Sequence, residues 1–384
     1  MDVPINREEL VSLLAELVSI RSINPAYDPS SNEAELAQCV AARLDDWGIS
    51  YQFQEVFPGR PNVLAQVPGR DANRRLLFEA HMDTVSILGM DIPPFEPRIE
   101  KNRLWGRGSC DTKAGLAAML YALKTVSAVG PPSCTIMLAA TVDEEYAFRG
   151  VSHLIDSGIK ADAAVVSEPT GLDVVIAHKG CLRWRILTRG KAAHSSKVHL
   201  GLNAISKMAG VIQAIDTRLV PTYSRKCHPL LGTATLNIGM IEGGIQVNTV
   251  PDRCAIEVDR RMLPGESKDS VWAEFAEVLS GLRDADPALQ VEMEEPKLYS
   301  VPLETDEREH VVRVAQEACR ETTGRGITAG VPYGTDASKL SRVGIPSIVL
   351  GPGNIDQAHS SVEFVDLDQV TQAAEIYARM MLSF

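Results

Sequence analysis

The sequence has no paired cysteine motif, no long apolar run and no excess of positive charge. Its seven cysteines are scattered, odd in number and never arranged as C-x-x-C, which argues against a disulfide framework and against a thiolate zinc site. No stretch approaches the roughly 20 apolar residues of a membrane span. The opening MDVPINREEL also lacks the basic start and apolar run of a secretory signal. We therefore predict a cytoplasmic protein with reduced cysteines and no membrane partner.

The charge and the length narrow the class of protein further. A formal net charge of −12 argues against nucleic acid as a main partner, because nucleic acid requires a basic surface. The chain is 45% hydrophobic and 23% charged, which is typical of a soluble globular protein. Its 384 residues are too many for one ordinary core and fit two domains. We find no internal repeat and no low-complexity tract.

The first part of the chain alternates between apolar runs and helical patterns. Helices are predicted at residues 6–20, 32–47, 113–126 and 151–157, the first with Asn6 as N-cap. The apolar runs between them read NVLAQV, LLFEAHMDTV, TIMLAATVDEE and AAVVSEPT. Alternation of strand and helix predicts an α/β domain with a mainly parallel sheet.

The pattern changes after about Ala177 and changes back at about Lys297. Between these points the order is β-α-β-β-α-β, with alternating polar and apolar residues in the strands, which is typical of a small α+β sandwich. We therefore predict one catalytic domain, residues 1–178 and 295–384, interrupted by an inserted domain, residues 179–294.

Five side chains of metal-binding types stand where predicted strands end: His81, Asp111, Glu145, Glu168 and His359. Functional groups of open α/β sheets gather at the carboxyl ends of the strands. Taken singly, each has an ordinary explanation: His81 is compatible with a buried pair with Asp83, and Asp111 with an N-cap of the next helix. Together the five predict a site for two metal ions.

Glu144, next to Glu145, adds the group that hydrolysis requires. A metal hydrolase needs a carboxylate that is not a ligand to take the proton of the water. Successive side chains of an extended segment point to opposite sides, so we predict Glu145 as ligand and Glu144 as general base. Asp83 is predicted to hold the second ring nitrogen of His81.

The chemistry of the predicted ligands indicates which metal they bind. Carboxylates and imidazoles without cysteine suit zinc, cobalt or manganese. Three carboxylates also balance most of the charge of two divalent ions, and Asp111 has one oxygen for each ion. We therefore predict two divalent ions, with zinc first and cobalt or manganese as alternatives.

The segments HMDTV, GRGSCDTKAG, DEE, SEPT and AHSSVE, in this order, resemble the M20 family of metallopeptidases and amidohydrolases. The family includes acetylornithine deacetylase and succinyl-diaminopimelate desuccinylase. The resemblance implies a zinc-peptidase-like catalytic domain with two zinc ions, interrupted by an α+β sandwich lid through which many members form homodimers. It places His81 and Glu168 at one zinc, Glu145 and His359 at the other, Asp111 between them and Glu144 as the base.

The resemblance also implies roles for residues outside the metal site. In KAAHSS it marks His194, which in dimeric members reaches the active site of the partner and stabilises the oxyanion. Asn248 and Arg261 match residues that hold the substrate carboxylate, although Arg260 beside Arg261 leaves that alignment ambiguous. YGTDAS places Thr335 in a loop that lines the acyl pocket. Without the resemblance, these are ordinary loop, turn and strand residues.

Together these features predict an enzyme that hydrolyses the amide bond of a small N-acylated amino acid. The ending GPGNIDQAHSSVEF resembles the acetylornithine-deacetylase branch of the family. A metallo-dipeptidase or carboxypeptidase acting on short peptides is an alternative, and so is a non-catalytic metal-binding module. The presence of Glu144 together with all five predicted ligands argues against the non-catalytic module.

Overall fold

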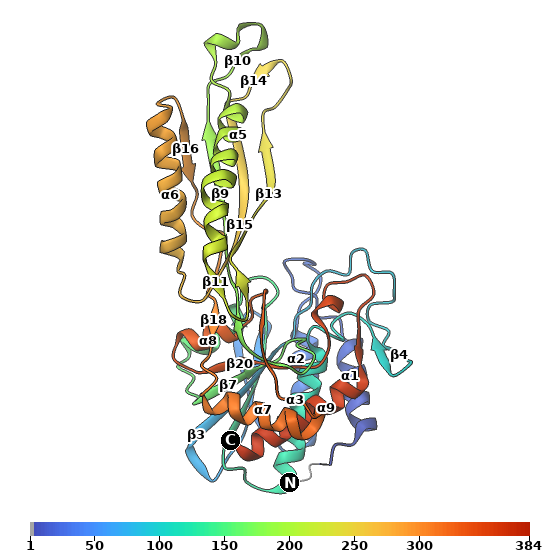
Figure 1. Ribbon diagram of the computed structural model, residues 1–384. Helices are drawn as coiled ribbons and strands as arrows, with labels where there is room; N and C mark the ends of the chain where they lie inside the picture. The colour runs from blue at the N-terminus through green and yellow to red at the C-terminus, as the bar shows by residue number, and fades with distance from the viewer. Residues whose placement is uncertain (1–3) are drawn as a thin grey trace. The chain divides into compact units, whose positions relative to one another are not determined.

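The computed structural model describes residues 4–384, which form two compact units (Figure 1). Unit 1 contains residues up to 176, then 305–329 and 335–384, and unit 2 contains residues 177–304 and 330–334. Unit 2 therefore interrupts unit 1 in the sequence. None of the helices within residues 4–384 combines the length and the apolar character that a membrane crossing requires.

The main sheet, most of which belongs to unit 1, has nine strands in the order β1-β2-β6-β3-β7-β20-β8-β18, with β19 also paired to β8. At its centre β3 pairs in parallel with β6 and β7, and β20 pairs in parallel with β7, whereas β1, β2, β8 and β18 are antiparallel. This arrangement confirms the predicted α/β class with a mainly parallel central sheet. The strands are β1 Ser50–Phe57, β2 Arg60–Val67, β3 Asp71–His81, β6 Cys134–Thr141, β7 Ala163–Val166, β8 Val174–His178, β18 Leu303–Glu304, β19 Thr328–Val331 and β20 Ser347–Val349.

Helices cover the sheet of unit 1, and the sequence explains where they begin. Asn6 caps the first helix by accepting hydrogen bonds from the N–H groups of Glu8 and Glu9, and the leucines on the inner side of that helix are buried. The third helix is apolar on nearly every side and is correspondingly buried in the core. The helices are α1 Arg7–Ser19, α2 Ala34–Asp46, α3 Lys113–Val129, α4 Arg149–Asp156, α7 His310–Thr323, α8 Ala337–Arg342 and α9 Leu367–Ser383.

A close approach between α3 and the end of β7 depends on Gly115. A Cβ atom at this position would lie 1.7 Å from the Oγ of Ser167, so no larger residue fits without displacement. Ser167 precedes Glu168, and the first turn of α3 follows Asp111. Gly115 therefore allows the segments that carry these two acids to come together.

Unit 2 is an antiparallel sheet with helices α5 and α6 on one face (Figure 1). The element order β9-α5-β13-β15-α6-β16 matches the predicted β-α-β-β-α-β pattern. The ring of Trp184 packs edge-on against Phe275 in its core, with 4.7 Å between centroids. A further strand, β17, pairs with β9, so the sheet of unit 2 continues beyond residue 294. The elements are β9 Gly180–Arg189, α5 Ala204–Ala214, β13 Thr235–Gly243, β15 Arg253–Met262, α6 Lys268–Ala285, β16 Gln290–Met293 and β17 Leu298–Ser300.

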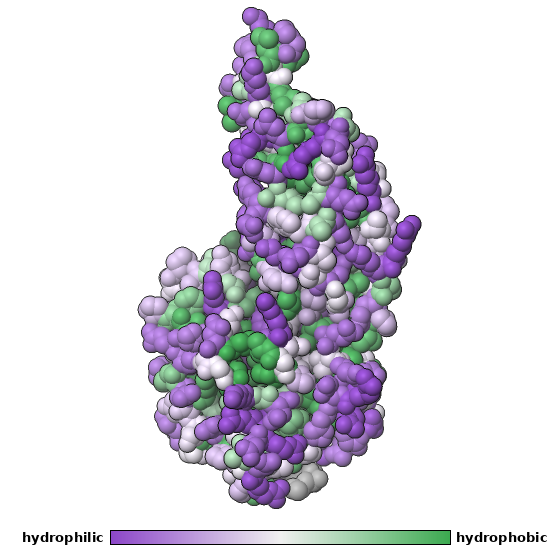
Figure 2. All heavy atoms as spheres, turned by 90° about the vertical axis from the view of Figure 1, so that its left-hand side faces the viewer, coloured by the Kyte–Doolittle hydropathy of each residue, from purple (hydrophilic) through white to green (hydrophobic). Residues whose placement is uncertain are grey.

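One edge strand of the unit 2 sheet has exposed apolar side chains. Within the described residues β13 pairs on one side only, with β15. Its side chains Met240 and Ile241 are 64% and 60% exposed. Figure 2 shows one face of the molecule, on which hydrophilic residues surround patches of hydrophobic residues. Exposed strand edges with apolar side chains are sites where chains pair.

Candidate metal centre

The carboxyl ends of three central strands bring the predicted metal ligands of unit 1 together. His81 is the last residue of β3, Glu168 lies just beyond β7, and Glu145 follows the turn after β6. The Nε2 of His81 lies 3.9 Å from Oε1 of Glu168. All three side chains are buried or nearly so. This follows from the parallel pairing of β6, β3 and β7, which places the three strand ends at the same edge of the sheet.

Asp111 lies between the two histidines. Its Oδ1 is 3.1 Å from Nε2 of His81, and its Oδ2 is 3.3 Å from Nε2 of His359. The alternative that Asp111 caps α3 is wrong, because Thr112 is the N-cap residue and no side chain caps that helix. The sequence predicted that Asp111 stands at the end of a strand. In the structure Asp111 is instead at the end of a loop that leads into α3. One oxygen toward each imidazole is the geometry that a bridging carboxylate needs.

The loop before Asp111 is bent and firmly anchored. Gly106 and Gly108 have φ angles of 153° and 79°, which favour glycine. Lys113, at the start of α3, is buried, and its Nζ donates to the backbone oxygens of Leu17 and Ile20 at 2.9 and 2.7 Å. Burial lowers the pKa of Lys113 to about 7. Gly106, Gly108 and Lys113 therefore shape and fix the loop that carries Asp111.

His359 comes from the far end of the chain and completes the cluster. It follows a short 3₁₀ turn, Ile355–Gln357, and has a φ of 58°. Its Nε2 is 3.1 Å from Oε2 of Glu145. Hydrogen bonds to Asp111 and Glu145 raise the pKa of His359 to about 10. Its side chain is 54% exposed, so this is the open side of the cluster.

The cluster has the donors and the charge to hold metal ions. Two groups of three side chains could each bind a metal ion, because their ligand atoms lie within 4.8 Å of one another. The first group is His81, Asp111 and Glu145, and the second is His81, Glu144 and Glu168. Burial and the charge of Asp111 raise the pKa of Glu145 to about 7, and the same two causes raise the pKa of Glu168 well above its usual value. Such crowded buried acids lack positive charge, which divalent ions supply. Oxygen and imidazole donors without thiolate fit zinc, cobalt or manganese.

Glu144 lies beside the ligands and has an environment suited to proton transfer. It is 9% exposed, and burial raises the pKa of its carboxyl group well above the usual value, although His81 acts in the opposite direction. A buried carboxylate with a raised pKa is a good proton acceptor near neutral pH. The grouping of Glu144 with His81 and Glu168 also makes it a possible ligand. The geometry therefore admits both roles, and an experiment described below separates them.

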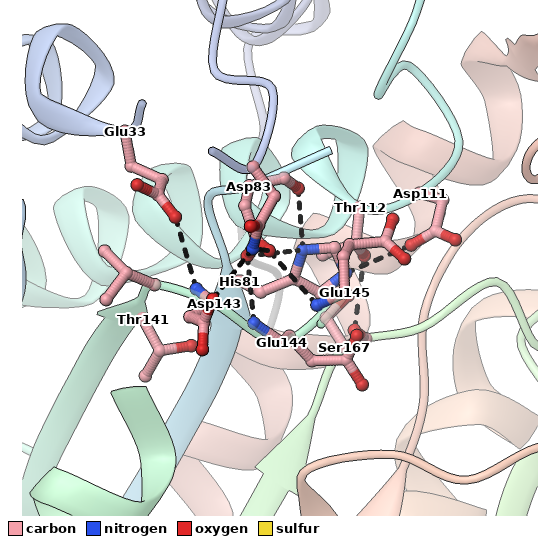
Figure 3. Close-up of polar contacts among 12 residues, drawn as sticks. Glu33, His81, Asp83, Asp111, Thr112, Thr141, Asp143, Glu144, Glu145 and Ser167 are labelled. Carbon is pink, nitrogen blue, oxygen red and sulfur yellow. Dashed lines mark hydrogen bonds and ion pairs between the residues drawn. The ribbon is translucent and has the colours of Figure 1, made fainter. Parts of the chain in front are cut away.

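Asp83 is close to His81 but holds it differently from the prediction. Nδ1 of His81 is 2.9 Å from the backbone oxygen of Asp83 and 3.6 Å from its carboxylate. The carboxylate of Asp83 instead accepts the backbone N–H groups of Glu144 and Glu145, both at 3.1 Å (Figure 3). The backbone oxygen of Asp83 is thus placed to orient the imidazole ring of His81. The carboxylate of Asp83 is placed to hold the backbone of Glu144 and Glu145.

A second buried network, which the sequence did not indicate, supports the turn that carries the glutamates. Asn24 donates to Asp83 and to Asp143, at 2.8 and 2.9 Å. Arg60 forms two hydrogen bonds with Glu33, at 2.6 and 2.7 Å. Glu33 also accepts the backbone N–H of Asp143 (Figure 3). Asp143 has a φ of 67°, so the turn is held in a conformation that most residues avoid. These residues come from loops and strands whose contacts no local pattern reveals.

The predicted substrate residues of unit 2 have few contacts of their own. His194, in the short strand β10 (Ala193–His194), is exposed, and its Nδ1 is 2.8 Å from Oγ of Ser196. Asn248 is exposed, just before the short strand β14 (Thr249–Val250) that pairs with β10. Arg261 is half-buried, and its Nε donates to Asp259 at 2.8 Å.

The ambiguity between Arg260 and Arg261 has a structural answer. Arg260 is 0% exposed, donates to Glu266 at 2.7 Å and lies 4.1 Å from the centroid of the Tyr223 ring. Successive residues of β15 point to opposite faces of the sheet, so Arg260 belongs to the core of unit 2 and only Arg261 is accessible.

Thr335, the predicted residue of the acyl pocket, belongs to unit 1 and is fully buried. Its hydroxyl accepts the N–H of Ala337 at 3.2 Å, at the start of α8. A place in the wall of a substrate pocket stays a prediction.

Comparison with known proteins agrees with this geometry. An acetylornithine deacetylase of Vibrio campbellii is 30% identical over 398 residues, which cover 98% of each chain. An N-formyl-4-amino-5-aminomethyl-2-methylpyrimidine deformylase of Halalkalibacterium halodurans is 27% identical and covers 99% of this chain and 94% of its own. The crystal structure of the aminopeptidase PepT of Bacillus cereus superposes with a TM-score of 0.82, at 26% identity and 98% coverage of both chains.

The pattern of one family extends over most of the chain. The sequence model of peptidase family M20/M25/M40 matches residues 77–383. This range includes all five predicted metal ligands and Glu144. The cluster of His, Asp and Glu side chains supplies the metal-binding groups that such an enzyme requires. The chain therefore belongs to peptidase family M20/M25/M40 and is a metal-dependent hydrolase of amide bonds.

Proposed function

We propose that the chain uses two divalent ions, zinc in the first place, to hydrolyse the amide bond of a small N-acylated amino acid. The observation that carries the proposal is the Asp111 carboxylate, which has one oxygen near each histidine, with Glu144 alongside. Two relatives support the class of substrate, because their names describe removal of an acetyl and of a formyl group from nitrogen. Both names point to a short acyl group.

Five residues would hold the two ions. His81 and Glu168 would bind one ion, Glu145 and His359 would bind the other, and Asp111 would serve both, as the distances between these side chains allow. Cobalt and manganese are alternatives to zinc, since all three accept oxygen and imidazole ligands. Ions in such a pair polarise the amide carbonyl and lower the pKa of a water molecule. Seven free cysteines fit the proposed cytoplasmic location.

Glu144 moves the protons of the reaction. Its carboxylate takes a proton from the attacking water and passes it to the amide nitrogen, so that the C–N bond breaks and a neutral amine leaves. Asp83 assists by holding the backbone of Glu144, which fixes the direction of that carboxylate. Burial raises the pKa of Glu144 above its usual value, which suits a carboxyl group that accepts a proton and then donates it.

Residues of unit 2 and Thr335 select the substrate. Arg261 and Asn248 bind the free carboxylate of the amino acid, because guanidinium and amide groups are matched donors for it. His194 stabilises the oxyanion in the active site of a partner subunit. The support is that these three side chains are accessible while Arg260 is not. Thr335 lines the acyl side of the pocket.

A homodimer through unit 2 is part of the proposal. The unpaired side of β13 and the apolar residues Met240 and Ile241 support it, because a second copy would cover both. Sedimentation velocity of the wild type should show a dimer, and Ile241→Lys should shift it toward monomer. Substitution of Ile99, 53% exposed in unit 1, by lysine is the matched control and should leave the dimer intact. A fully active wild-type monomer would exclude the trans role of His194.

The decisive experiment combines metal titration with a substrate panel. Metal-free protein is titrated with zinc, and hydrolysis is measured on amino acids that carry formyl, acetyl or succinyl groups. We expect activity to rise up to about two equivalents of zinc, with the shortest acyl groups cleaved fastest. Di- and tripeptides belong in the panel, because the likeness to an aminopeptidase favours a peptidase as the second candidate. Zinc binding without cleavage of any amide would instead indicate a non-catalytic module.

A further inference from the structure

Glu363 is a buried acid next to the metal centre that has no role in the mechanism above. It follows the segment of His359 and precedes β21 (Phe364–Asp366), which pairs with β5 (Arg103–Trp105). Its side chain is 0% exposed. A carboxylate so deeply buried is costly unless its oxygens are fully hydrogen bonded.

All of the hydrogen bonds of Glu363 go to the loop that carries Asp111. Oε1 accepts the backbone N–H groups of Cys110 and Asp111, at 2.9 and 3.1 Å. Oε2 accepts the backbone N–H of Gly108 at 3.1 Å and Nη1 of Arg107 at 2.6 Å. Each oxygen thus has two donors, which is about the full accepting capacity of a carboxylate.

Three of these four donors are main-chain groups of the loop, and one belongs to Asp111 itself. A carboxylate that only balanced the charge of Arg107 would not need them. Because the backbone of Asp111 is held, the direction in which its side chain leaves the loop is held as well. The same residue lies four positions after His359, so it connects the two segments that meet at Oδ2 of Asp111.

We infer that Glu363 is a positioning residue of the metal centre. Glu363 sets the direction of the Asp111 carboxylate and keeps that carboxylate close to His359. The inference rests on the proposed function, because it assumes that Asp111 and His359 are ligands. It predicts that the two ions depend on Glu363 unequally. The ion held by Asp111, Glu145 and His359 depends on it most, because two of its three ligands come from the segments that Glu363 joins.

The test is Glu363→Gln, measured by zinc titration calorimetry and by the visible absorption of the cobalt(II)-loaded protein. Glutamine has the same shape, but its amide offers one acceptor oxygen and turns an NH₂ group toward two of the donors. We expect the affinity for one of two ions to fall about 10- to 100-fold and the cobalt spectrum to change, while the other ion binds as in the wild type. Turnover should fall at limiting zinc and recover in part at high zinc, with little change in KM.

Glu266→Gln is the matched control. Glu266 is a mostly buried acid of unit 2, with its side chain 11% exposed, and it accepts hydrogen bonds from Arg260, Lys226 and the N–H of Leu263, at 2.7, 3.1 and 2.8 Å. Loss of the Glu266 carboxylate also disrupts a network of several hydrogen bonds around one acid and should lower the Tm. It should leave both zinc affinities and the cobalt spectrum unchanged, since its partners all belong to unit 2.

Glu363→Asp keeps the test decisive if the glutamine variant does not fold. Aspartate keeps the charge beside Arg107 but is one methylene too short to reach all four donors, so we expect a folded protein with the same loss at one ion. The inference is overturned if either folded variant binds two zinc ions with wild-type affinity and spectrum while its Tm falls as in Glu266→Gln. Failure of the proposed function has a different signature, in which the wild type itself binds no zinc pair or cleaves no amide.

Discussion

The two units differ in how their functional side chains are held. In unit 1 the proposed base and four of the five proposed ligands are buried. Asp83 and Glu363 accept backbone N–H groups beside them, and Asn24 donates to the carboxylate of Asp83. In unit 2 His194 and Asn248 are exposed. Within the described residues the side chain of His194 forms hydrogen bonds with Ser196. Unit 1 therefore contains a cluster that its own residues preorganise, whereas the proposed functional groups of unit 2 are exposed and have few partners within the chain.

This difference predicts two kinds of mutational effect. Changes in unit 1 should alter metal binding or the chemical step, because the groups there act on one another. Changes at exposed residues of unit 2 should alter substrate binding or oxyanion stabilisation without affecting the metals. The experiments below test this division, beginning with the largest expected effect.

Glu144→Ala should have the largest effect. Loss of a general base lowers kcat by about 10²–10⁴-fold, and we expect the upper part of that range because Glu144 serves in both proton transfers. Zinc binding should stay at about two equivalents if Glu144 is the base and not a ligand. The matched variant Glu145→Ala should lose one ion. Wild-type turnover in metal-loaded Glu144→Ala would contradict the mechanism.

Removal of the metal should make the stability of unit 1 depend on pH. The pKa of Glu145 is raised from 4.5 to about 7 in the folded chain, so the folded state binds this proton more tightly than the unfolded state. Its contribution is present below pH 4.5 and is lost as the pH rises toward 7, by up to about 3 kcal/mol. Urea unfolding of metal-free protein between pH 5 and 8 measures this loss. Saturating zinc should remove it, and a pH-independent metal-free protein would contradict the description of the cluster.

His194→Ala should lower kcat by about 10²-fold, because one donor to the oxyanion is lost. Zinc affinity and the cobalt spectrum should not change, since His194 belongs to unit 2. Mixing this variant with Glu144→Ala tests the trans role: exchange of subunits should restore part of the activity that neither variant shows alone. If mixing restores nothing although mixed dimers form, His194 does not act across the dimer.

Arg261→Ala should have the smallest of these effects, a rise in KM of about ten- to a hundredfold from the loss of a charge-assisted contact. An N-acylated amine without a carboxylate should be hydrolysed equally by variant and wild type. Arg260→Met is the neighbouring control: it should lower the Tm, because Arg260 is buried against Tyr223. Equal KM values for Arg261→Ala and the wild type would remove Arg261 from the substrate site.

The sequence predicted the fold well where local patterns decide it. The helix with Asn6 as N-cap is α1, the apolar run before His81 is β3, and the order of elements in unit 2 was as expected. The short strands β10, β14 and β17 were not predicted, because segments of two or three residues carry no periodic signal.

The candidate site was predictable to a different degree. Strand ends and residue types were sufficient to find His81, Glu145 and Glu168, which the parallel sheet brings together. The carboxylate of Asp83 was assigned to the ring of His81, but it accepts main-chain N–H groups instead. Glu33 and Glu363 were missed, since their partners lie 27 or more positions away along the chain. A signal for Glu363 was nevertheless present, as an acid four residues after a predicted ligand.

The interruption of unit 1 by unit 2 has a consequence for biosynthesis. Four proposed ligands, His81, Asp111, Glu145 and Glu168, leave the ribosome before residue 177, whereas His359 and Glu363 appear only after the whole intervening unit has been made. A nascent chain therefore carries four of the five proposed ligands without His359 while about half of the chain is still being made. Because the proposed second ion needs His359, we expect it to bind only when synthesis of the chain is nearly complete. The active enzyme would therefore form only after the last segment has been made.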